Sequence, residues 1–287
     1  MRSKERNQGS IEGSSVVPLE RLWDLLREDK LAEASSLLDA GGSWNDPLFD
    51  GAAGEEVGRV AVPRLASWLQ GRLAEKPIAH LRTTADDRRV AVEHVLPLKD
   101  GLIWNQAERR SEKAPRFELA VAAVADRSAG PRPYRAVRIY FSTWAVLDGK
   151  ARLRVGPICP DERAATQAAM DGFPVIRQYF DGLAAGDPGM IELFEPDGYF
   201  REPANNFACG RDQLTEHFQH ILELGGVGIE FLTATRQDQR LGLELQTVVW
   251  GTKKMPAPQA GFACYELGPH GKLQGARVYD SVVPPEF

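Results

Sequence analysis

The residue best placed to carry chemistry in this sequence is an aspartate near its C-terminal end, Asp280. In an extended strand alternate side chains point to opposite faces, and one face of this segment carries Ala276, Val278, Asp280 and Val282. An apolar environment raises the pKa of a carboxyl group and makes it a usable general acid or base near neutral pH. We therefore predict that Asp280 is a catalytic acid or base. The alternative is a strand-end aspartate that caps backbone or meets solvent.

Two further acids, Asp46 and Glu202, stand directly before prolines. A residue before proline is biased toward extended backbone. Aromatic neighbours, Trp44 and Tyr199 among them, would give each acid an apolar wall. We predict both acids as catalytic candidates. The alternative is a turn residue whose carboxylate accepts hydrogen bonds from nearby backbone.

His80 and Glu230 stand near the starts of two matching predicted strands. A histidine beside an acid can act as a base close to neutral pH. This predicts two catalytic pairs, Asp46 with His80 and Glu202 with Glu230. The alternative for His80 and Glu230 is a solvated strand end.

Five aromatic side chains are predicted to line substrate pockets. They are Trp44, Tyr179, Tyr199, Trp250 and Tyr265. The alternative is that they belong to the core, which is where buried aromatic residues ordinarily lie.

No motif in the sequence predicts a metal or a cofactor. His217 and His220 are three apart on a predicted helix, but no third ligand is evident, so we interpret them as a solvated helix face. Phosphate loops, nucleophile elbows and dinucleotide fingerprints are missing. The three cysteines are far apart in the sequence, which argues against a disulfide framework and favours a cytoplasmic protein.

The 287 residues carry a net charge of −5, which gives no basic footprint for nucleic acid. Residues 1–16 are polar and Gly/Ser-rich, and we expect them to be a disordered tail. No stretch approaches the roughly 18 consecutive apolar residues that suggest a membrane span, and the first residues lack the apolar core of a secretory signal. The expected partner is a small hydrophobic ligand.

The two halves of the sequence repeat one another, so the candidate residues can be assigned to equivalent places in two similar units. The matching segments are 136–142 with 275–281, 43–47 with 199–203, and 90–93 with 241–244. Each half places helical patterns first and several long alternating strands afterwards, an order that predicts an α+β fold. We predict a first domain over 17–153, a linker over 154–170 that carries a helix from Asp161, and a second domain over 171–287. Phe141 stands where the second half has Asp280, so the halves are expected to differ in role.

Both halves retain one Glu–Arg–Tyr set. It comprises Glu93, Arg138 and Tyr140 in the first half and Glu244, Arg277 and Tyr279 in the second. Residues kept by both halves should serve the fold, so we predict an ion pair between neighbouring strands within each half, on the outer face of its sheet.

The second half resembles SnoaL-like proteins of the nuclear-transport-factor-2-like superfamily. The resemblance rests on Tyr179-Phe180, Gly186-Asp187, Glu202-Pro203, Trp250-Gly251 and Arg277-x-Tyr279-Asp280, with a looser match in the first half. It implies a strongly curved antiparallel sheet wrapped around helices, with a pocket inside the cone, and two such cones pairing sheet to sheet as an intramolecular pseudo-dimer. A further homodimer is compatible with it.

Members of that superfamily include isomerases, polyketide cyclases, dehydratases and epoxide hydrolases that act without a metal. The resemblance therefore implies a cofactor-independent acid–base enzyme acting on a small hydrophobic, polyketide- or terpenoid-like molecule. Other members only bind small molecules or support assembly, so a non-catalytic binding protein and a structural protein are the alternatives.

Overall fold

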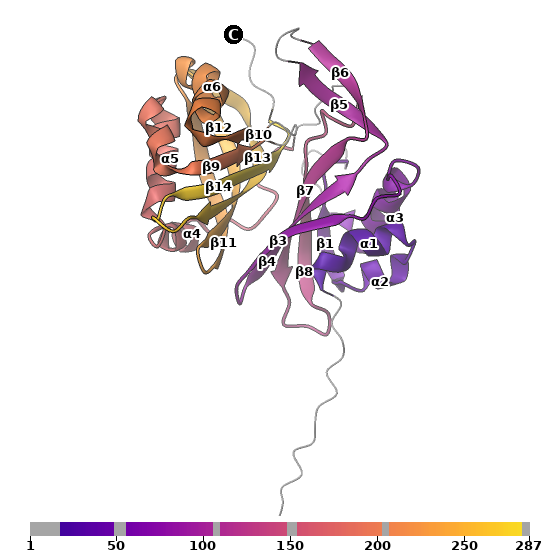
Figure 1. The fold of residues 1–287 in the computed structure, drawn as a ribbon. Coiled ribbons are helices and arrows are strands. Elements are labelled where there is room, and N and C mark those ends of the chain that lie inside the picture. Colours follow the sequence, from indigo (N-terminus) through magenta and orange to yellow (C-terminus); the bar gives the residue numbers. More distant parts are fainter. Residues whose placement is uncertain (1–17, 49–55, 106–109, 148–153, 203–206, 283–287) are drawn as a thin grey trace, which may run out of the picture.

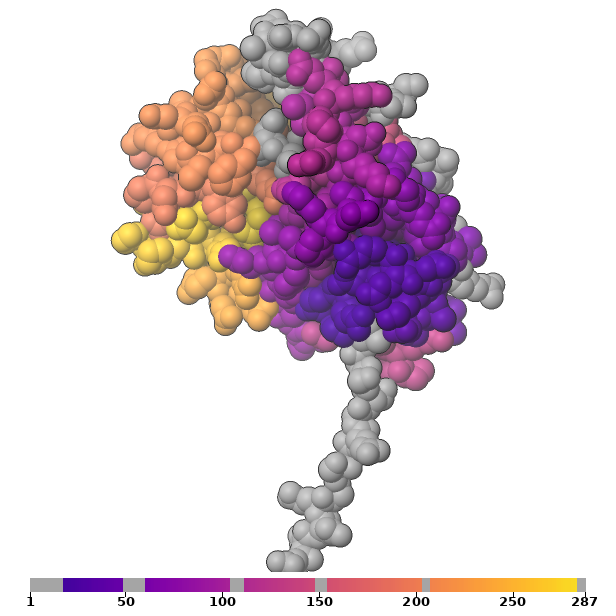
Figure 2. Space-filling view, turned by 45° about the vertical axis from the view of Figure 1, so that its right-hand side comes forward, coloured from indigo at the N-terminus to yellow at the C-terminus, as the bar shows by residue number. Residues whose placement is uncertain are grey.

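The computed structural model describes residues 18–48, 56–105, 110–147, 154–202 and 207–282. These form two α+β units, each a curved six-stranded sheet with helices on one face, and the two sheets face each other (Figure 1). Figure 2 shows the surfaces of the two units in contact on one side of the molecule. The expected tail, residues 1–16, lies outside the described part. In that part no helix has the length and apolar character of a membrane span.

The first unit begins with short helices and continues into its sheet. Its helical elements are η1 (Leu19–Arg21), α1 (Leu22–Arg27), α2 (Leu31–Ser35) and α3 (Gly58–Leu69). Its strands are β1 (Leu38–Asn45), β2 (Glu56–Val57), β3 (Ala79–Ala85), β4 (Arg89–Pro97), β7 (Glu118–Arg127) and β8 (Tyr134–Tyr140), and a separate hairpin is formed by β5 (Asp100–Asn105) and β6 (Arg110–Pro115).

The second unit follows the same plan. Its helical elements are α4 (Arg163–Met170), α5 (Pro174–Ala185), η2 (Pro188–Leu193) and α6 (Gly210–Glu223). Its strands are β9 (Phe194–Arg201), β10 (Phe207–Cys209), β11 (Val227–Gln237), β12 (Arg240–Trp250), β13 (Lys253–Leu267) and β14 (Leu273–Asp280). The strand orders, β2-β1-β8-β7-β4-β3 and β10-β9-β14-β13-β12-β11, are equivalent, which confirms the duplication.

Helix α5 shows how local sequence positions these elements. Pro174 occupies its first turn, where no intrahelical donor is needed, and Gly186 ends it with φ at 66°, a conformation that glycine adopts without strain. The residues facing the core recur at helical spacing, namely Ile176, Tyr179, Phe180 and Leu183. The sheet therefore wraps around an apolar helix stripe.

The two acids that precede prolines, Asp46 and Glu202, each directly follow a strand, β1 and β9 respectively. β1 pairs parallel with β8, and β9 pairs parallel with β14. Apolar residues keep helical spacing from Leu19 to Leu38 in the sequence, but the helix breaks after Arg27, where Asp29 has φ at 58°, and Leu38 is the first residue of β1. The parallel partners lie between 76 and 96 positions away, so the local sequence carries no signal of the pairing.

An additional hairpin and a linker helix extend the two units. The hairpin of β5 and β6 lies between β4 and β7 of the first unit. Helix α4 lies within the predicted linker and packs on β11 of the second unit, where the Thr166 hydroxyl donates to the Leu232 carbonyl at 3.1 Å.

Small and aromatic side chains form the contact between the two sheets. The first unit contributes Ala91, Ala120, Ala122, Val124 and Tyr140, and the second contributes Phe262, Cys264 and Tyr279. All are buried. The units thus pair sheet to sheet as an intramolecular pseudo-dimer.

The glutamates and arginines that both halves retain pair between the units, which corrects the prediction that each pair lies within one half. Arg277 Nε donates to Glu93 at 2.6 Å, and Arg138 Nε donates to Glu244 at 2.5 Å. Each glutamate also accepts a hydrogen bond at 2.7 Å from the tyrosine of the other unit. Within each unit the glutamate and the arginine stand two strands apart, because β7 lies between β4 and β8 and β13 lies between β12 and β14. Two strand spacings amount to about 10 Å, so the partner has to come from the facing sheet.

These crossed pairs are almost completely buried. Burial by itself raises the pKa of the Glu244 carboxyl, but the charge and hydrogen bonds of Arg138 more than offset it, so that pKa is lowered. Asp126 also accepts two hydrogen bonds from Arg138 and one from Arg89. Each buried charge therefore has a partner, as burial of charge requires.

Candidate functional site

Asp280 ends β14 and lies on the apolar face that wraps the second core. Its strand neighbour on that face, Val278, packs against the core, and the Asp280 side chain lies beside Gly261, its paired residue on the neighbouring strand β13. The side chain is half-buried. Asp280 thus lies in apolar surroundings, and part of its side chain remains exposed.

This environment tunes the carboxyl toward neutral pH. Burial raises the pKa of Asp280 to about 6, and the nearby carboxylate of Glu202 adds to the rise. A hydrogen bond from the Val282 amide at 3.2 Å acts in the opposite direction. A carboxyl group with this pKa can both accept and return a proton at neutral pH.

Glu202 follows β9 and meets a histidine of α6. His217 Nε2 lies 3.0 Å from Glu202 Oε1, and the His217 side chain is only 11% exposed. The imidazole packs against Phe200 and Phe218, with ring centroids 4.9 and 5.0 Å away. Asp280, Glu202 and His217 therefore form one group of interacting titratable side chains in the second unit.

The equivalent region of the first unit is closed by aromatic and arginine side chains. Phe141, at the position of Asp280, is buried and stacks on Trp68 with centroids 5.4 Å apart. Asp46, at the position of Glu202, accepts hydrogen bonds from Trp44 Nε1 at 2.9 Å, from the Leu48 amide, and from Arg64 of α3. An arginine holds its charge at every physiological pH, so this acid is held in a permanent ion pair.

Asp46→Ala is therefore expected to act on stability. It leaves the buried Trp44 N–H without its acceptor and removes the Asp46 carboxylate from Arg64, so the free energy of unfolding should fall by about 1–3 kcal/mol. Urea denaturation measures this change. Asp24→Ala, which removes a surface partner of Arg27, is the control and should cost below about 1 kcal/mol. Equal losses in the two variants would contradict a structural role for Asp46.

Comparison with known proteins places this geometry among similar folds. No protein-family model and no curated protein matches the sequence. Solved structures that match include a proposed polyketide cyclase from Sinorhizobium meliloti, with 15% identity and a TM-score of 0.33 over 38% of this chain and 97% of that one.

Two further structures show the same kind of match. An epoxide hydrolase/cyclase-like enzyme of pyran ring formation in salinomycin is 17% identical, with a TM-score of 0.34 over 40% of this chain and 95% of its own. A protein of ketosteroid isomerase-like fold from Catenulispora acidiphila, in complex with trimethylamine, is 16% identical, with a TM-score of 0.32 over 38% and 85%. Each match spans less than half of this chain, which is also the share that one unit takes up. The likeness concerns the fold alone.

In the second unit, the space beside Asp280 is narrow. A crevice at the seam of the two units is bordered by Asp280, Phe141 and Arg154 and has no room for a water molecule. A ligand that reaches Asp280 by this route must therefore displace side chains around it.

The other two predicted catalytic residues have different partners from those expected. His80 is exposed, its Nε2 lies 2.9 Å from Thr83 Oγ1, and its ring lies 5.3 Å from that of His94. Burial and the neighbouring His80 lower the pKa of His94 to about 4. Glu230, 44% exposed, accepts hydrogen bonds from Arg163 and Gln246.

The predicted pocket aromatics divide between core and surface. Trp44 lies in the first core, Tyr179 and Tyr265 lie in the second, and Trp250 packs against the second while half-buried. Burial raises the pKa of Tyr265, and the charge of Asp280 contributes. Tyr199 instead points to the seam, where its hydroxyl accepts from Arg277.

His217 is the site residue that sequence reasoning missed. We interpreted it as part of a solvated helix face, together with His220, which is indeed exposed. Its position directly before the buried Phe218 was the available signal, because it places the imidazole at the border of the apolar stripe. In the described residues no group of three His, Cys, Asp or Glu is arranged to hold a metal.

Proposed function

We propose that the second unit is an acid–base enzyme for a small hydrophobic molecule of polyketide- or terpenoid-like character, with Asp280 as the proton-transferring group. The observation that carries this proposal is the pKa of Asp280, raised to about 6 on an apolar inward face. An aspartate that only meets solvent does not require an apolar environment, and groups with a strongly shifted pKa concentrate at functional sites.

Proton transfer assigns each of the three residues a role. Deprotonated Asp280 takes a proton from a carbon or hydroxyl of the substrate and returns it elsewhere on the same molecule, as isomerisation, cyclisation, dehydration and epoxide opening all require. The Glu202–His217 pair lies beside it, and the negative charge of Glu202 strengthens Asp280 as a base. Leu245, Phe200 and Tyr265 supply apolar contacts for a ring system.

The pH dependence of the reaction tests this assignment. A suitable probe is 2-tetralone, a bicyclic ketone whose α-protons exchange with D2O by abstraction next to a carbonyl. Because the base works deprotonated, the protein-dependent exchange rate, measured by proton NMR, should rise as pH increases through about 6 and level off above pH 7. A rate that equals the buffer rate at every pH, or that rises only above pH 8, would count against Asp280 as the base.

A second function, non-catalytic binding of a small molecule, is favoured by one observation. The crevice beside Asp280 is closed to water, so the site is not open for rapid turnover in this conformation. Thermal unfolding with and without 2-tetralone separates the two functions. A raised melting temperature without exchange above the buffer rate would favour the binding protein, and both effects together favour the enzyme.

A further inference from the structure

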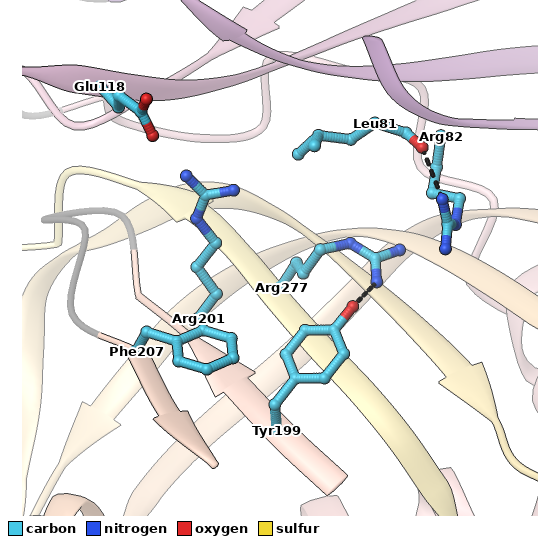
Figure 3. A pocket seen from close by; sticks show the side chains of 7 residues that line it. All are labelled: Leu81, Arg82, Glu118, Tyr199, Arg201, Phe207 and Arg277. Carbon is cyan, nitrogen blue, oxygen red and sulfur yellow. Dashed lines mark hydrogen bonds between the residues drawn. The ribbon is translucent and has the colours of Figure 1, made fainter. Parts of the chain in front are cut away.

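A cavity of about 500 Å³ lies at the seam of the two units, apart from the crevice beside Asp280 (Figure 3). Strands β3 and β7 of the first unit line one side of this seam cavity, and strands β9, β10 and β14 of the second unit line the other. Its volume falls within the usual range for small-molecule pockets. The seam cavity is therefore large enough for a small ring system.

An exposed aromatic ring forms part of the second-unit wall. The ring of Phe207 stacks on that of Tyr199, with centroids 5.4 Å apart and planes 28° apart. Tyr199 is held in place, because its hydroxyl accepts a hydrogen bond from Arg277. Phe207 is nevertheless 59% exposed, although burial of a phenylalanine side chain is worth about 1.5–3 kcal/mol. The Phe207 ring is thus supported from one side and has apolar surface left for a second flat ring.

The first unit adds an apolar side chain to the same space. Figure 3 shows Leu81 of β3 reaching into the cavity from the first-unit side, opposite the wall that carries Tyr199 and Phe207. Leu81 is only half-buried. A flat apolar molecule in the cavity would therefore remove apolar surface of both walls from water.

The arginines of the inner part of the cavity are matched by glutamates. Arg277 Nε lies 2.6 Å from a carboxylate oxygen of Glu93. Arg82, on the opposite wall, lies 3.6 Å from Glu266, which is also 3.4 Å from Arg277. These guanidinium groups therefore already face carboxylates of the protein itself.

The remaining lining arginine, Arg201, is also engaged. Its guanidinium points toward the side of the cavity that carries Glu118 (Figure 3). Three arginines thus stand with three glutamates, so the described walls carry no excess charge. A charged ligand would have to separate one of these pairs or lose water without gaining a partner, and both are costly. A neutral ligand avoids both costs.

The seam cavity and the second-unit core lie on opposite sides of the same strand. Tyr199 and Arg201 of β9 line the cavity. Phe200, between them, belongs to the second core and contacts His217, the neighbour of Glu202. Alternation along a strand explains this separation. A ligand in the seam cavity would therefore leave the Asp280 site unoccupied.

We propose that the seam cavity binds a small, uncharged, planar aromatic molecule whose ring stacks on Phe207 and contacts Leu81. Offset stacking on a supported aromatic ring supplies affinity, and the balanced walls select against both signs of charge. This binding is independent of proton transfer at Asp280.

Isothermal titration of the full chain with three probes that share one ring system tests the proposal. The probes are the neutral 2-naphthalenemethanol, the anion 2-naphthoate and the cation 2-naphthylmethylammonium, at neutral pH. The wild-type protein should bind the alcohol at least about fivefold more tightly than either charged probe, because only the charged probes must lose hydration without a free partner. Tighter binding of either charged probe would overturn the proposal, since it would show that unmatched charge dominates the cavity.

Two substitutions test the roles of the walls separately. Phe207→Ala should weaken binding of the alcohol about tenfold by removing the stacking surface, and the exposure of Phe207 makes its removal tolerable for the fold. Arg82→Gln removes one positive charge at a 49% exposed side chain. It should leave binding of the alcohol unchanged while it favours the cation over the anion by at least about threefold relative to wild type.

Two controls locate the site. Val60→Ala removes apolar surface from α3 at a position that is 55% exposed, and it should leave affinity for the alcohol unchanged. Asp280→Asn should also leave it unchanged, while Phe207→Ala should leave 2-tetralone exchange unchanged. The proposal is overturned if the alcohol does not bind at millimolar concentration, if Phe207→Ala binds it as tightly as wild type, or if Asp280→Asn alone abolishes binding.

Discussion

Asp280→Asn is expected to reduce protein-dependent exchange of 2-tetralone α-protons by about 10²–10⁴-fold, the usual contribution of a positioned general acid or base. Asparagine keeps the size of the side chain and its hydrogen bond from the Val282 amide, but it cannot accept a proton at neutral pH. Proton NMR in D2O at pH 7.5 measures the loss. Asp181→Asn, at an exposed position of α5, is the matched control and should exchange at the wild-type rate.

The same substitution should stabilise the fold at alkaline pH. The folded-state pKa of Asp280, about 6, lies above the ordinary value of 3.8, so the folded protein binds the proton more tightly than the unfolded chain does. Stability from this group is therefore complete below pH 4 and is lost as pH rises through 6. Asp280→Asn avoids that loss, which should raise the free energy of unfolding at pH 8 by on the order of 2 kcal/mol.

These two readouts separate a catalytic role from a structural one. A general base placed in an apolar environment lowers the stability of the fold and raises the reaction rate. Its removal should therefore increase the free energy of unfolding and decrease the exchange rate. Loss of exchange together with loss of stability would indicate that Asp280 serves the fold. Unchanged exchange would remove it from the mechanism.

Glu93→Ala should be the most destabilising single substitution at the seam of the two units. It removes both hydrogen bonds from the Arg277 guanidinium to Glu93 and the acceptor of the buried Tyr279 hydroxyl. Arg277 then remains buried with Glu266 at 3.4 Å. Removing one partner of a buried ion pair costs about 3–5 kcal/mol, and the loss should lie in this range because Glu266 makes a longer contact than Glu93 and compensates the Arg277 charge only in part. Urea denaturation of the full chain measures the loss.

A double variant distinguishes the cost of an orphaned charge from the value of the pair. Glu93→Leu with Arg277→Met replaces both charges by apolar groups, and we expect it to recover most of the stability lost in Glu93→Ala. Asp171→Ala, which removes the exposed partner of Arg177, should cost under about 1 kcal/mol. A Glu93→Ala variant as stable as the Asp171→Ala control would show that the crossed pair does not hold the seam together.

Several features of the fold could be predicted from local sequence. The repeated strand pattern at 136–142 and 275–281 predicted two equivalent units, and alternation along the last strand put Asp280 on the apolar face. The replacement by Phe141 predicted that the units differ, and the first unit is indeed filled at this position by the stacked Phe141 and Trp68. Each of these features depends on side-chain periodicity, which is encoded within a few residues.

The pairing of charges was decided by the tertiary structure. Glu93 and Arg277 are 184 positions apart, and Arg138 and Glu244 are 106 apart. Periodicity correctly placed these residues on the outer sheet faces, but it carries no information about which outer face meets which. The packing of two curved sheets against each other selects the partner, so the pairs cross between units.

The contact between His217 and Glu202 was also decided by the tertiary structure. Helical periodicity places it at the border of the apolar stripe of α6, where both a solvated and a buried imidazole are possible. The way α6 rests against the end of β9 turns it toward Glu202. The sequence by itself thus determined that the chain folds into two cone-shaped units and that Asp280 lies on an inward face. The docking of helix on sheet and sheet on sheet determined which charged groups meet, because those contacts join residues that no local pattern connects.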